Sequence, residues 1–178
     1  MLHTMQFINF SFTKKFQMKK AAFLRLLYSN SAVPVSVIQR ICIGLNKNGL
    51  IPKGSNHKDP ELNWQHICLI IYSTYMSPST VKGIEEYSKK RKENQENDKQ
   101  VLGGILEALT NPNDLKMLFI SETNIIVMKD NVNLFFGYAT ENELSNIPDM
   151  VNKAYKVPGF IFKNLAAGIL MERSAILN

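Results

Sequence analysis

One stretch, Val33 to Ser55, constrains the fold more than any other, because its pattern is that of a single amphipathic helix with a defined end. Its apolar residues recur every four positions with one neighbour, which gives a helix one apolar face: Val33, Val37, Ile41, Leu45 and Ile38. Pro34 suits a first helical turn, where its missing N–H has no partner. Gly49 stands where a left-handed cap is needed, and Pro52 follows.

The opposite face of this predicted helix is polar and basic. It carries Ser36, Arg40, Gly44 and Lys47, with Gln39 and Asn46 at its flanks. Gly44 is unfavourable at this position, since a glycine in a helix interior lowers helix stability by about 1 kcal/mol relative to alanine. Two explanations compete: the helix approaches a phosphate or another backbone there, or it is an ordinary amphipathic helix with Gly44 packed against a neighbour.

Charge is distributed unevenly along the chain, whose formal net charge is +6. Residues 1–58 contain nine basic residues and no acidic one, and the first carboxylate is Asp59. The remainder is slightly acidic. An acid-free basic segment is typical of a surface that contacts phosphates. A chance run, a targeting segment, or a surface for an anionic membrane or acidic protein are the alternatives.

The elements around the basic helix suggest a helix-turn-helix. Met18–Tyr28 has a helical pattern, and Ser29–Ser31 is a polar turn. Helix, short turn, helix and Gly-Leu-Ile-Pro follow in the order of that motif. The basic loop from Lys53 to Lys58 would lie along a phosphate backbone, as in winged domains, or be a plain solvated connection.

The rest of the chain divides into further segments. Residues 1–17 are expected to be a basic arm or an upstream extension, with a targeting sequence as the third option. Asp59 and Pro60 are expected to cap a buried helix containing Trp64, and Ser77-Pro78 a second helix. The highly charged residues 89–99 are expected to be a solvated helix end or linker. We therefore predict a helix-turn-helix-like domain at 18–88, a linker at 89–99, and a module at 100–178.

The module at 100–178 has an α+β pattern. Val101–Leu109 predicts a short helix, and β-type runs follow at 117–120 and 124–129. Asp130-Asn131 separates the run at 124–129 from a further β-type run at 132–138, so residues 125–138 predict a β-hairpin. Thr140 with Glu143 resembles a capping box. A helix from about Pro158 to Ser174 ends the chain. The expected fold class is thus mainly α, with a small α+β C-terminal part.

The sequence contains no catalytic constellation, and we expect neither enzymatic activity nor a cofactor. Walker, dinucleotide-binding and G-x-S-x-G motifs are missing. The four residues nearest to a metal-ligand set lack the paired spacing that zinc sites use: Cys42, His57, His66 and Cys68. Both cysteines lie in apolar helical patterns, so free buried thiols in the reducing cytoplasm are expected. No apolar run approaches the roughly 18 residues of a membrane span.

From Val35-Ser36 to Asn48-Gly49-Leu50-Ile51-Pro52, the chain resembles small helix-turn-helix proteins of phages and prophages, and more loosely the MerR-like group. The likeness covers roughly residues 18–87, and the Pro60-Glu61-Leu62 segment fits the same layout. The helix is longer than the MerR-like pattern, and Ile41 and Cys42 replace the expected aromatic residue. The resemblance implies major-groove contact by five residues: Ser36, Gln39, Arg40, Ile43 and Lys47.

These observations together predict a protein that binds double-stranded DNA, as a homodimer, in transcriptional regulation or as a phage-type packaging or recombination accessory. Arg40 would read a base edge, most often guanine. Five lysines would contact phosphates: Lys47, Lys53, Lys58, Lys19 and Lys20. The alternative is an adaptor or effector protein whose basic half binds an acidic partner or an anionic membrane.

Overall fold

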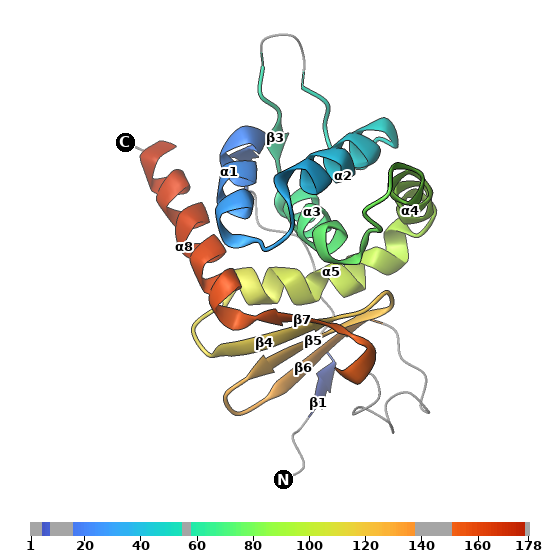
Figure 1. The fold of residues 1–178 in the computed structure, drawn as a ribbon. Helices are drawn as coiled ribbons and strands as arrows, with labels where there is room; N and C mark the ends of the chain where they lie inside the picture. The colour runs from blue at the N-terminus through green and yellow to red at the C-terminus, as the bar shows by residue number, and fades with distance from the viewer. Residues whose placement is uncertain (1–4, 8–15, 55–57, 138–150, 177–178) are drawn as a thin grey trace.

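A computed structural model describes residues 5–7, 16–54, 58–137 and 151–176. The fold has a layer of helices above a mixed β-sheet, and helix α5 runs between them (Figure 1). The helical layer contains two short strands and four helices: β2 (Met18–Lys19), α1 (Lys20–Asn30), α2 (Val35–Lys47), β3 (Glu61–Leu62), α3 (Trp64–Met76) and α4 (Val81–Glu93). The fold class expected from the sequence, mainly α with an α+β C-terminal part, is confirmed.

The sheet has five strands in the order β1-β6-β5-β4-β7. They are β1 (Met5–Phe7), β4 (Leu115–Ile120), β5 (Asn124–Lys129), β6 (Asn133–Gly137) and β7 (Tyr155–Pro158). All neighbours are antiparallel except β1, which runs parallel to β6. The predicted hairpin is confirmed as β5 and β6, and the N–H of Lys129 donates to the carbonyl oxygen of Val132 across its turn.

Among the described residues, two helices cover the sheet on the side that faces the helical layer: α5 (Gln95–Thr110) and α8 (Gly159–Ile176). α8 confirms the predicted C-terminal helix and also packs against α1. The main hydrophobic core extends without interruption from Phe16 to Ile169, so it includes side chains from both predicted domains. Val101, Leu102 and Ile105 of α5 are among the residues that link the two layers.

The predicted cap at Asp59 was wrong. Residues 61–62 form β3, which pairs with β2, and α3 begins only at Trp64 with Asn63 as its N-cap. The Asp59 carboxylate instead accepts the backbone N–H of Ala21, at 3.0 Å from one oxygen, and so caps α1. The cap at Ser77-Pro78 was also misplaced, because Thr80 accepts the N–H of Gly83 at the start of α4.

Of the two expectations for residues 89–99, a solvated helix end or a linker, the structure has helix ends. These residues form the end of α4 and the start of α5, which meet at Asn94. Arg91 and Asp98, in the middle of this charged run, are buried. At the other end of the chain, residues 5–7 of the expected arm form β1, and Phe16 stacks on Trp64 with ring centroids 4.1 Å apart. The predicted capping box at Thr140 and Glu143 lies outside the described residues.

No helix among the described residues has both the length and the apolar character needed to cross a membrane.

Candidate nucleic-acid interface

Helix α2 confirms the predicted amphipathic pattern. Ile38, Ile41, Cys42 and Leu45 are buried, and the helix packs against α3 and α4. Its C-terminal end is a Schellman motif. Gly49 has φ of +72°, its N–H donates to the carbonyl of Asn46 at 3.1 Å, and the Leu50 N–H donates to Leu45 at 3.0 Å. The end of the basic helix is therefore fixed by its own backbone.

The five residues expected to enter the major groove share one exposed face of α2. They are Ser36, Gln39, Arg40, Ile43 and Lys47, and all five are exposed. At 100° per residue, they occupy an arc of about 100° around the helix axis. Ile43 and Ser36 lie near the middle of this arc, and Arg40 and Lys47 lie along the edge nearest to α4. We call this set the α2 face.

Gly44 does not belong to the exposed surface. It is buried against α4, where an added Cβ would lie 2.7 Å from the Ser88 hydroxyl oxygen and 3.0 Å from Ile84 Cγ2. Of the two explanations for this glycine, the structure supports packing against a neighbouring helix. Close approach to a phosphate at Gly44 is excluded, because α4 occupies that side of α2.

Arg40 and Lys47 make only weak contacts with the protein. Arg40 Nε donates to the Ser36 carbonyl at 3.1 Å and Arg40 Nη1 to the Ser79 carbonyl at 3.4 Å. Lys47 Nζ lies 3.3 Å from a carboxylate oxygen of Glu85. More than half of each charged side chain in the Lys47–Glu85 pair is exposed. Exposed pairs contribute at most about 1 kcal/mol. Both cations are therefore available to another partner at little cost.

Three of the expected phosphate-contacting lysines, Lys19, Lys20 and Lys58, lie near the start of α1. Lys19 lies in β2 and pairs with Glu61 at 2.9 Å, and the half-buried Lys20 begins α1. The N–H of Lys20 donates to the carbonyl of Pro60, which places Lys58 two residues from this point. Lys53 and Lys58 are exposed. His57 and the middle of their loop lie outside the described residues.

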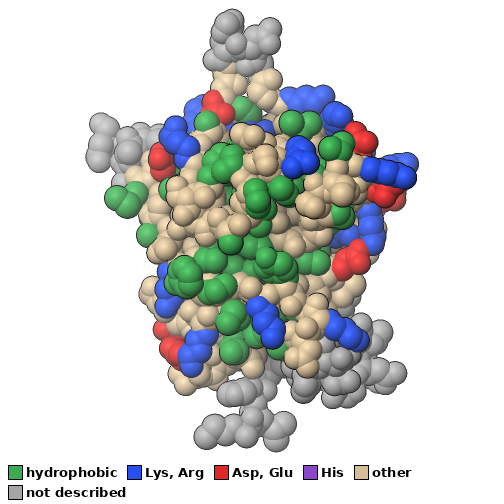
Figure 2. All heavy atoms as spheres, in the orientation of Figure 1, with side chains coloured by type: hydrophobic (Ala, Val, Ile, Leu, Met, Phe, Trp, Pro, Cys, Tyr) green, Lys and Arg blue, Asp and Glu red, His purple; other side chains and the backbone are tan. Residues whose placement is uncertain are grey.

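An apolar notch lies between the α2 face and α4. Its volume is about 70 Å³. It is lined by Arg40, Ile43, Gly44, Lys47, Val81, Ile84 and Glu85. Ile43 is 54% exposed and Val81 62% exposed, although both are large aliphatic residues. Figure 2 shows hydrophobic side chains interspersed with Lys and Arg on the upper, helical part of the molecule.

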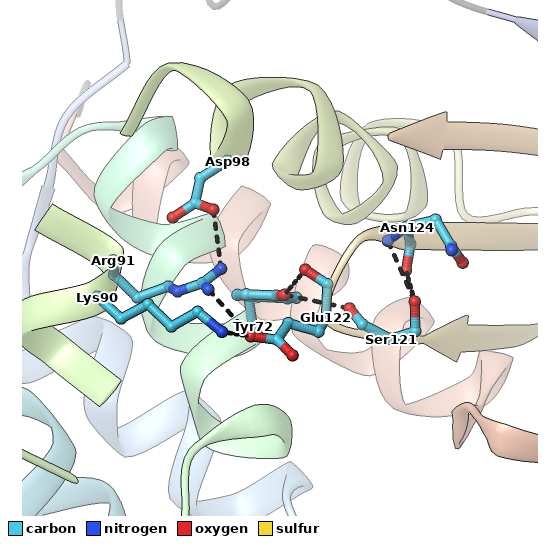
Figure 3. A network of polar contacts seen from close by, with 7 residues as sticks. All are labelled: Tyr72, Lys90, Arg91, Asp98, Ser121, Glu122 and Asn124. Atoms are coloured by element: carbon cyan, nitrogen blue, oxygen red, sulfur yellow. Dashed lines mark hydrogen bonds and ion pairs between the residues drawn. The ribbon is translucent and has the colours of Figure 1, made fainter. Parts of the chain in front are cut away.

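A buried ion-pair network lies where α4 meets α5 (Figure 3). Arg91 Nη1 donates to Asp98 Oδ1 at 2.8 Å, and both side chains are less than a tenth exposed. The Tyr72 hydroxyl donates to the carbonyl of Glu122 at 2.8 Å, and the Glu122 carboxylate pairs with Lys90. Burial raises the pKa of Asp98 to about 6, against the opposing effect of Arg91. The network ties the helical layer to the β4–β5 turn.

The sequence interpretation missed this network. Its only local signal is the seven-residue spacing of Arg91 and Asp98, and the run around them contains other residues of both charges. A pocket of about 180 Å³ adjoins it. Arg91 and Asp98 line this pocket together with His66 and Gly49, the capping residue of α2.

Neither cysteine is placed for chemistry. Cys42 and Cys68 are buried free thiols, and burial raises the pKa of Cys42 to about 11. Burial also lowers the pKa of His66, whose Nδ1 accepts the N–H of Asn63. Within the described part of the chain, no three His, Cys, Asp or Glu side chains come together as metal ligands.

Comparison with known proteins adds no assignment to this geometry. No family model, no curated protein and no solved structure matches the chain.

Proposed function

We propose that this protein binds double-stranded DNA through the α2 face, with α1, the turn and α2 acting as a helix-turn-helix. The role would be that of a transcriptional regulator or a phage-type DNA accessory protein. A homodimer bound to two half-sites is part of the proposal, since helix-turn-helix proteins commonly bind in that way.

The observation that carries the proposal is the chemistry of the α2 face. Gln39 and Arg40 can donate to base edges in the major groove, Ser36 can donate or accept, and Ile43 offers apolar contact. α2 contains no acidic residue that would repel phosphates. Folding thus concentrates polar, cationic and apolar groups suited to a groove on one exposed arc.

The lysines at the start of α1 support the same proposal. Lys58 is brought near Lys19 and Lys20 by two hydrogen bonds, one from the Lys20 N–H to the Pro60 carbonyl and one from the Ala21 N–H to the Asp59 carboxylate. Phosphate contacts of this kind position a protein on a duplex without reading its sequence. On binding, Lys19 and Lys47 would leave the carboxylates of Glu61 and Glu85 and contact phosphates instead.

A fluorescence-anisotropy titration of the full chain tests the proposal, with random duplex and a pool selected for binding. If the five lysines Lys19, Lys20, Lys47, Lys53 and Lys58 each contact a phosphate, log affinity should fall against log salt with a slope of about −4.5. Enrichment of one sequence from the pool is also expected. Lys47→Ala should weaken binding.

Lys116→Ala is the matched control for Lys47→Ala. Lys116 also lies in an exposed ion pair, 3.0 Å from Asp130, but it belongs to β4 of the sheet. Its removal should leave the titration unchanged. No binding to any duplex at low salt would contradict the proposal. Retention on vesicles containing anionic lipid, or on an acidic protein, would then favour the alternative partner for the basic surface.

A further inference from the structure

The notch between α2 and α4 is an unusual feature for a basic surface. Ile43 lies near the middle of the α2 face, and Val81 lies in the first turn of α4. The buried side chain of Ile84 also lines the notch. Two exposed aliphatic residues beside a buried one give the notch an apolar lining.

The rim of the notch indicates the charge of its partner. Arg40 and Lys47 border it on α2, and Glu85, the one carboxylate there, is paired with Lys47. A polyanion that carries small apolar groups fits this combination. Duplex DNA has that character in its major groove, where pyrimidine 5-methyl groups project among polar base edges.

We propose that the notch receives the 5-methyl group of a pyrimidine in the major groove, next to a guanine contacted by Arg40. This inference rests on the proposed DNA-binding function. The volume of about 70 Å³ exceeds the roughly 10–15 Å³ that a cavity needs to hold one water molecule. A methyl group is of similar size, so the notch has room for it.

The spacing along α2 sets the relation between the two contacts. Arg40 and Ile43 are three residues apart, which is about 4.5 Å along the helix axis. Successive base pairs are separated by about 3.4 Å. The methylated pyrimidine and the guanine therefore belong to neighbouring base pairs, and the preferred site contains such a step.

Substitution of uracil for thymine tests the proposal, because it removes only the methyl group. Each thymine of the selected duplex is replaced singly, and binding of the full chain is measured by anisotropy. At one position per half-site the Kd should rise about fourfold, the value expected for one methyl-sized apolar group. Cytosine and 5-methylcytosine at that position distinguish thymine from a methylated cytosine as the natural source.

Protein variants identify where the methyl group binds. Ile43→Ala should bind the thymine and uracil duplexes equally, and Val81→Ala should reduce the difference between them. Val35→Ala is the matched control, since Val35 is an exposed aliphatic residue of α2 that does not line the notch. It should keep the fourfold preference.

Three results would overturn the inference. Equal binding of thymine and uracil duplexes at every position would overturn it while leaving the DNA-binding function intact. A preference that persists in Ile43→Ala would show that the methyl group is contacted elsewhere. Failure of the chain to retain any duplex would overturn both this inference and the proposed function.

Discussion

Gly44 of α2 lies so close to Ser88 of α4 that a Cβ on Gly44 would stand 2.7 Å from the Ser88 hydroxyl oxygen. The same Cβ would stand 3.0 Å from Ile84 Cγ2. The absence of a side chain at Gly44 therefore determines how closely α2 packs against α4. Arg40, Ile43 and Lys47 flank this glycine, so their positions on the surface depend on that packing.

We expect Gly44→Val to destabilise the fold. A valine side chain cannot fit without separating α2 from α4, and such overpacking costs about 1–3 kcal/mol. Urea denaturation of the full chain measures the free energy of unfolding. Gln39→Val is the matched control, because it places the same side chain at an exposed position of the same helix. Equal losses in the two variants would show that packing against α4 is not responsible.

The burial of the Asp98 carboxyl predicts a pH-dependent stability. Burial raises the pKa of the Asp98 carboxyl from 3.8 to about 6. Because the folded protein then holds the proton more tightly than the unfolded chain, this contribution to stability is fully present below pH 3.8. It is lost as the pH rises through about 6. In Asp98→Asn, the free energy of unfolding should no longer lose this contribution as the pH rises through about 6, as measured by urea denaturation.

Glu122 provides a control of opposite sign in the same network. Its hydrogen bond with Lys90 lowers the pKa of the Glu122 carboxyl below 4.5. Its contribution to stability is therefore present above pH 4.5 and lost in acid. Glu122→Gln should be less stable than the native chain at neutral pH, and the difference should vanish in acid. An unchanged pH profile in Asp98→Asn would contradict the assignment to Asp98.

Some features of the fold could be predicted because their causes are local. The end of α2 depends on Gly49, whose left-handed backbone angle is expected from the residue itself. The β5–β6 hairpin follows from two apolar runs on either side of Asp130-Asn131. The α2 face could be predicted too, since helical periodicity alone places Ser36, Arg40 and Ile43 on one side.

Other features could not be predicted because their partners are distant in the sequence. Asp59-Pro60 has the local signature of a helix start, but the N–H that Asp59 accepts belongs to Ala21, 38 residues earlier. Likewise, Arg91 and Asp98 are buried by contacts from other elements. Tyr72 and Tyr87 face the Arg91 guanidinium at 5.8 and 5.2 Å from their ring centroids. A charged run does not reveal which of its members will be enclosed.

The division at residues 89–99 can be tested by truncation. We expect residues 18–92 alone not to fold cooperatively, because they lack Asp98 as the partner of Arg91 and the α5 residues that contact α3. The full chain should unfold in a single transition, with coincident circular dichroism and Trp64 fluorescence. Two separate transitions, or a cooperatively folded fragment, would instead show that the halves are independent domains.

Replacing Arg40 and replacing Lys53 by alanine should differ in one respect. Only the loss of affinity caused by Arg40→Ala should depend on the DNA sequence. Arg40 lies on the α2 face, so Arg40→Ala should cost about 1–3 kcal/mol on the selected duplex and relax specificity at one base pair. Lys53 follows α2 and is exposed, so Lys53→Ala should weaken binding to all duplexes alike and reduce the salt slope by about 1. Anisotropy titrations on selected and random duplex at several salt concentrations separate the two effects. An equal loss on both duplexes for Arg40→Ala would assign Arg40 to the phosphate backbone, because only a contact to a base edge distinguishes one sequence from another.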